Sequence, residues 1–201
     1  MSAPQTAAAD LEFIRGVIQR TDQQVDPHAF HYVHWGAIVL FWYPLATYFE
    51  HQGNQTAYAW LGLGALALGV LLSTVREIVL ARGPRLHGEN TFVGRQMTQI
   101  TILCVAAGVV LSALGPPTGF LAGRDVPTLW GLVYATMACM LGVVYRRSFL
   151  YAGLFIFAGA IGAILWPQWN GYILGPCMGL GMIVPGLQAE ARVKRLRAEA
   201  P

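Results

Sequence analysis

The sequence predicts an all-α fold, a polytopic membrane bundle of six transmembrane helices, from its composition, its long apolar stretches and the placement of its basic residues. Hydrophobic residues make up 55% of the 201 residues and charged residues only 11%, a balance outside the usual range of soluble domains. Six apolar stretches each contain roughly 20 residues, enough for a helix to cross a hydrocarbon layer of about 30 Å. The predicted helices cover residues 30–49, 57–75, 97–114, 128–145, 149–166 and 169–187.

Basic residues lie almost entirely on one side of this predicted topology. Apart from Arg124, every Lys and Arg falls in the N-terminal segment, in the C-terminal tail, or in the second and fourth gaps between the apolar stretches. Because basic flanks are retained on the cytoplasmic face, both termini are predicted to be cytoplasmic. The topology-determining residues in the gaps and the tail are Arg76, Arg82, Arg85, Arg95, Arg146, Arg147, Arg192, Lys194, Arg195 and Arg197.

The N-terminal segment is polar overall but contains one amphipathic stretch. Within residues 10–24, the apolar residues Leu11, Ile14, Val17 and Ile18 recur at helical spacing. Basic and amide side chains occupy the rest of that helical surface. The pattern predicts either a short interfacial helix lying on the cytoplasmic leaflet or a docking surface for a soluble partner.

Short gaps constrain how the last three predicted helices pack. Residues 146–148 and 167–168 leave almost no loop on either side of the fifth helix, so the last three helices are expected to be antiparallel neighbours. The gap at 76–96 is the longest and is either a cytoplasmic contact surface or a solvated linker. The chain therefore divides into a cytoplasmic N-terminal segment (1–29), a transmembrane domain (30–187) and a basic cytoplasmic tail (188–201).

Glycine is abundant, and most of the 23 glycines fall within the apolar stretches. Small residues allow the backbones of membrane helices to approach closely. Such contacts occur either within one chain or at an interface between copies of the chain, and the sequence leaves both open. The small-residue pairs that fit this pattern best are Gly62 and Gly69, Ala158 and Gly162, and Gly175 and Gly179.

Three histidines mark the start of the first predicted helix. His28, His31 and His34 are spaced by three residues, so they fall within one third of the helix circumference. They could present imidazoles to a ligand headgroup, but no Cys pair or second histidine-bearing helix completes a metal site. The pattern favours ordinary hydrogen bonds at the membrane boundary and predicts no metal and no cofactor.

The sixth predicted helix has an unusual backbone composition. Gly175, Pro176, Gly179 and Gly181 lie close together, and Pro185 follows. Because each proline removes a helical hydrogen bond, a kinked or broken helix is predicted. A break can expose backbone dipoles to a substrate within the membrane, whereas a kink can also be purely structural.

Ionisable side chains are missing from the six apolar stretches. None of them contains Asp, Glu, Lys or Arg, although proton relays and ion-coupled carriers usually place such residues inside the bundle. Neither a nucleophile–His–acid arrangement nor a metalloprotease motif is present, so no catalytic residues are predicted. The basic residues lie at membrane boundaries rather than on one continuous face, which argues against a nucleic-acid partner.

Two short segments carry a family resemblance. Leu-Glu-Phe-Ile-Arg at 11–15 and Gly-Leu-Gly-Met-Ile-Val-Pro-Gly-Leu at 179–187 resemble segments of uncharacterised small bacterial six-helix integral membrane proteins, which are often encoded beside a winged-helix regulator. The resemblance implies a multi-pass protein of the bacterial cytoplasmic membrane. It supplies no catalytic residues.

Taken with the missing chemistry, these patterns predict a non-catalytic regulatory, scaffolding or accessory subunit of a membrane complex. Its expected partners are the lipid bilayer and a protein partner, or a second copy of the chain, packed through glycine-lined helix faces. One alternative is a small carrier or channel for an uncharged or lipid-like solute that uses a broken sixth helix. A second is a haem- or quinone-binding redox subunit that uses His31 and His34.

Overall fold

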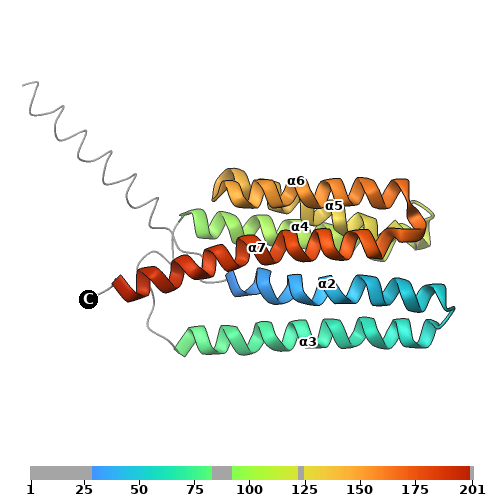
Figure 1. Cartoon of the computed structure of the whole chain (residues 1–201), viewed down its shortest axis with the longest axis horizontal. Helices are drawn as coiled ribbons and strands as arrows, with labels where there is room; N and C mark the ends of the chain where they lie inside the picture. Colours follow the sequence, from blue (N-terminus) through green and yellow to red (C-terminus); the bar gives the residue numbers. More distant parts are fainter. Residues whose placement is uncertain (1–28, 83–91, 122–124, 200–201) are drawn as a thin grey trace, which may run out of the picture.

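The computed structural model describes residues 29–82, 92–121 and 125–199, and its long elements are all helices (Figure 1). The predicted interfacial helix at 10–24, together with His28 and Arg85, lies outside the described residues. The helices are α2 (Ala29–His51), α3 (Gln55–Arg82), α4 (Phe92–Thr118), α5 (Val126–Val144), α6 (Arg147–Leu165), the short 3-10 helix η2 (Pro167–Trp169) and α7 (Asn170–Glu199).

Five of the helices, α3 to α7, are long and apolar enough to cross a membrane, as expected of a multi-pass membrane protein. Helix α2 is 23 residues long but is not among the five. Its polar and amphipathic side chains, including His31, His34 and several Trp and Tyr residues, lower its apolar character. The six-span topology and the cytoplasmic location of both termini therefore stay predictions.

The helices form a four-helix centre with one helix on either side. Successive helices run in opposite directions along the long axis (Figure 1). Helix α7 packs extensively against α2 and α6, and α6 packs against α5. Helix α3 packs mainly against α2, and α4 packs mainly against α5. The predicted antiparallel packing of the last three helices is confirmed.

The predicted loop at 76–96 is wrong at both ends. Helix α3 continues to Arg82, and α4 begins at Phe92, so Arg76, Arg82 and Arg95 lie on helices. The basic tail is likewise a helical extension, because α7 continues to Glu199. Helical hydrogen bonds are satisfied within the segment itself, so a helix need not end where its apolar stretch ends.

The sixth predicted helix is continuous rather than broken. Pro176 and Pro185 both lie inside α7, and Pro185 is fully buried. On the face toward α2, a Cβ built on Gly179 would lie 2.6 Å from Cβ of Leu40 and 2.9 Å from the carbonyl oxygen of Gly36. These separations are too short for real carbon contacts, so glycine is required for the two backbones to approach this closely.

Candidate functional site

A groove of about 850 Å³ lies between the α2–α3 pair and the α4–α5 pair. Its volume is within the range of small-molecule sites in proteins. The side chains around it are overwhelmingly apolar or aromatic. They include Trp35, Val39 and Trp42 of α2, Ala65, Leu66 and Val70 of α3, Thr101, Val105 and Val109 of α4, Trp130 and Tyr134 of α5, and Met178 and Met182 of α7.

The groove exists because, among the described helices, α3 packs mainly against α2 and α4 packs mainly against α5. Only 6% of the apolar segment of α3 and 11% of that of α4 is buried, against 50% for α7. Across the described ranges, no extensive interface joins α3 to α4. The groove therefore has little protein wall between these two helices, and the surrounding membrane would reach it from that side.

The groove chemistry suits a large apolar molecule. Trp35, Trp42 and Trp130 supply flat aromatic surface, and Met178 and Met182 supply flexible, polarisable side chains. The indole N–H of Trp42 is buried and has no hydrogen-bond partner among the residues that the structure describes. Since buried donors are almost always paired, this N–H is suited to an acceptor on a bound ligand.

A more polar cavity, here called the vestibule, continues the groove toward the end of the bundle that holds the α2–α3 turn and η2. Its volume is about 800 Å³. The two cavities share four lining residues, so they lie next to each other. The shared residues are Trp42, Tyr43, Tyr58 and Pro127.

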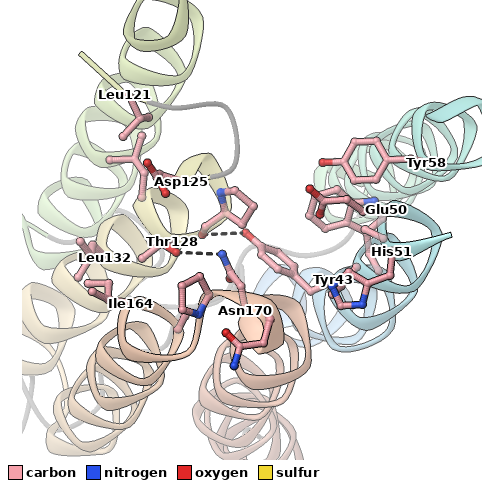
Figure 2. Close-up of a pocket in the computed structure, with 18 of the residues that line it drawn as sticks. Tyr43, Glu50, His51, Tyr58, Leu121, Asp125, Thr128, Leu132, Ile164 and Asn170 are labelled. Carbon is pink, nitrogen blue, oxygen red and sulfur yellow. Dashed lines mark hydrogen bonds between the residues drawn. The ribbon is translucent and has the colours of Figure 1, made fainter. Parts of the chain in front are cut away.

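Figure 2 shows how the vestibule is built from facing elements. Glu50 and His51 at the end of α2 lie on one side, together with Tyr58 of α3. Asp125 and Thr128 at the start of α5 lie on the other side.

Two hydrogen bonds tie the vestibule's elements together. The side-chain amide of Asn170, at the start of α7, donates to Oγ1 of Thr128 at 3.1 Å. The hydroxyl of Tyr43 donates to the carbonyl oxygen of Pro127 at 3.4 Å. The first bond joins α7 to α5 and the second joins α2 to α5, so both hold the mouth of the groove in place.

The predicted histidines make hydrogen bonds to α3 at the other end of the bundle. Nδ1 of His34 donates to the carbonyl oxygen of Phe30 at 2.9 Å, which leaves Nε2 to accept from the hydroxyl of Ser73 at 2.9 Å. Nε2 of His31 donates to Oε1 of Glu77 at 2.7 Å, and its Nδ1 lies 3.3 Å from Oγ of Ser73. The indole N–H of Trp35 also donates to Ser73, at 3.2 Å.

The prediction of ordinary hydrogen bonds is therefore confirmed for His31 and His34. His34 bonds through both ring nitrogens, and His31 bonds to Glu77 through Nε2. The sequence interpretation missed Ser73, which lies within the predicted helix at 57–75 but was not singled out, and Glu77, which lies beyond the predicted end of that helix. Their spacing of four residues would have indicated one helix face if the helix had been extended.

The glycines singled out in α7 do not contribute to either cavity. Cβ atoms built on Gly175 and Gly181 would lie 2.6 Å from Cδ of Pro44 and from Cγ1 of Ile156, respectively. Gly175, Pro176, Gly179 and Gly181 line neither the groove nor the vestibule, so the structure does not bring this predicted ligand site together. Helix α7 contributes the side chains of Met178 and Met182 instead.

The predicted topology-determining residues within the described ranges lie at or near the helix ends opposite the vestibule (Figure 1). One of them also packs on an aromatic ring, since the guanidinium carbon of Arg76 lies 5.3 Å from the ring centre of Phe30. These residues are Arg76, Arg82, Arg95, Arg146, Arg147, Arg192, Lys194, Arg195 and Arg197.

Comparison with known proteins adds no relative: no family model, curated protein or solved structure matches this chain.

Proposed function

We propose that this protein is a non-catalytic membrane protein that binds an uncharged, lipid-like molecule in the groove between the α2–α3 and α4–α5 pairs. The observation that supports this most is the groove itself, about 850 Å³ of apolar and aromatic surface left open where α3 and α4 fail to meet. The protein lies in a bacterial cytoplasmic membrane with both termini in the cytoplasm, as the clustering of basic residues at one end favours.

This proposal shares its ligand, a lipid-like molecule, with the carrier hypothesis, but it does not use a broken sixth helix. The ligand site is the aromatic groove, not a broken sixth helix, because the glycines of α7 are packed against α2 and α6. A hydrophobic molecule can enter sideways from the bilayer through the gap between α3 and α4. Quinones belong to the same chemical class, so a quinone is one possible occupant.

A pair of tryptophan substitutions on α3 tests the proposal. Ala65 lines the groove, whereas Ala67 is exposed and lies on another face of the same helix. The variant A65W should fill the groove, and A67W should add the same bulk outside it. The wild type and both variants are purified in mild detergent, and bound lipids and quinones are extracted and quantified by mass spectrometry.

We expect one dominant apolar molecule to copurify with the wild type and with A67W. Its amount should fall about tenfold in A65W, equivalent to a loss of about 1.4 kcal/mol of binding free energy. Thermal unfolding of the three proteins should be similar, because α3 has few packed neighbours to disturb. Equal ligand content in A65W and A67W would contradict the proposal.

A second candidate function is that of an accessory subunit whose partner helix packs on α3 or α4. The exposed faces of these helices favour it, since α3 alone carries Leu63, Leu68 and Leu71 at 58%, 49% and 60% exposure. Photocrosslinking from Leu71 in native membranes tests this role. A single protein adduct would support it, and adducts to lipid alone would count against it.

A further inference from the structure

We infer that the groove ligand is an amphiphile whose headgroup occupies the vestibule, and that this headgroup donates hydrogen bonds and carries no net negative charge. The inference rests on the proposed function and specifies the chemical class of the ligand. It depends on three features of the vestibule: its position beside the groove, its charge, and its hydrogen-bonding groups.

The position of the vestibule beside the groove gives the ligand its orientation. The groove and the vestibule meet at Trp42, Tyr43 and Tyr58, and both cavities have similar volumes. A chain lying along the groove would thus place its polar end among Glu50, His51 and Asn170. The vestibule lies at a helix end, where the headgroup region of a bilayer would surround it, while the groove extends toward the hydrocarbon.

Charge sets the sign of the headgroup. Glu50 and Asp125 line the vestibule, and none of its described lining residues is Lys or Arg. A phosphate or carboxylate headgroup would lie beside these carboxylates, and no Lys or Arg among the described lining residues would offset the repulsion between like charges. A hydroxyl or an amine would instead find acceptors.

The hydrogen-bonding groups of the vestibule favour a ligand with a donor in its headgroup and an acceptor where the headgroup joins the apolar chain. Oδ1 of Asn170 is buried without a partner among the described residues, while the amide nitrogen of the same side chain is bound to Thr128. The carboxylate of Glu50 is a further acceptor. Deeper in, where the vestibule meets the groove, the unpaired indole N–H of Trp42 can only donate, and an ester or amide carbonyl would satisfy it. The ligand class is therefore an acylated alcohol or amine.

Photoreactive lipids of matched chain length test the inference in the full-length protein reconstituted into vesicles. The probes are a diacylglycerol, a long-chain amine with an amide-linked tail, and a phosphatidic acid. We expect the diacylglycerol or the amine to label groove peptides about ten times more strongly than phosphatidic acid. Comparable or stronger labelling by phosphatidic acid at the same peptides would overturn the headgroup inference and leave the groove function standing. Absence of groove labelling by every probe would overturn both.

Two variants with the same change in net charge locate the effect. Glu50→Gln removes one negative charge inside the vestibule, and Gln52→Lys adds one positive charge at an exposed turn residue that does not line it. Glu50→Gln should reduce the preference for the neutral or cationic probe over phosphatidic acid about three- to tenfold, whereas Gln52→Lys should change it less than twofold. Equal effects would show that the general surface charge, and not the vestibule, selects the headgroup.

Discussion

Gly179, at the interface between α2 and α7, and Gly64, on the outlying helix α3, have opposite surroundings. At Gly179, an added Cβ would meet Leu40 at 2.6 Å, so the glycine holds two backbones together. At Gly64 on α3, nothing lies within 4 Å of such a Cβ. A glycine-rich membrane sequence can thus contain a closely packed centre and a loosely attached periphery, and the open groove belongs to the periphery.

The largest expected effect comes from substitution in the packed centre. Gly179→Leu should destabilise the protein by about 3 kcal/mol or more, because the side chain has no space between α2 and α7. The matched substitution Gly64→Leu should leave stability unchanged or raise it slightly, by up to about 1 kcal/mol, since leucine is the better helix former. Thermal unfolding of purified protein, followed by circular dichroism, measures both. Similar losses of stability in Gly179→Leu and Gly64→Leu would show that the two positions do not differ in packing.

A smaller effect is expected at the polar attachment of α3. Ser73→Ala removes the hydroxyl that bonds to His34 and Trp35, which leaves a buried imidazole and a partly buried indole without this partner, so a loss of about 1–3 kcal/mol is expected. Thr74→Ala is the control, because its exposed hydroxyl donates only to Val70 O in its own helix. That variant should differ from the wild type by less than about 0.5 kcal/mol. In limited proteolysis, α3 should be cleaved faster in Ser73→Ala than in Thr74→Ala. Equal cleavage rates for the two variants would contradict the prediction.

The smallest effect is expected where the groove meets the vestibule. Tyr43→Phe removes one long hydrogen bond to Pro127, at 3.4 Å, and keeps the buried ring, so the loss should be about 0.5–1 kcal/mol. Tyr48→Phe alters a half-exposed side chain on the same helix and should be neutral. Chemical denaturation in detergent can resolve the two. A loss at Tyr43 above 2 kcal/mol would indicate that α2 and α5 are joined more tightly than this single bond suggests.

The sequence determined the helices, because the length and apolarity of a membrane segment are local properties. Each of the six predicted segments matches one helix, although 128–145, 149–166 and 169–187 each pass an end of that helix by one residue. The short gaps at 146–148 and 167–168 correctly made neighbours of α5, α6 and α7. The helix ends were less well predicted. Polar residues such as Glu77 and Arg82 end an apolar stretch without ending the helix, since backbone hydrogen bonding does not depend on side-chain polarity.

The tertiary structure alone decided where a ligand could sit. The sequence drew attention to Gly175 and Pro176 because their composition is unusual, yet neither residue lines a cavity, and Gly175 packs against α2. The groove is made of common membrane residues, Trp, Met, Val and Ala, which acquire a role only because α3 and α4 each lack a second neighbour. Which faces remain unpacked depends on how all the helices fit together, and no local pattern in the chain encodes that arrangement.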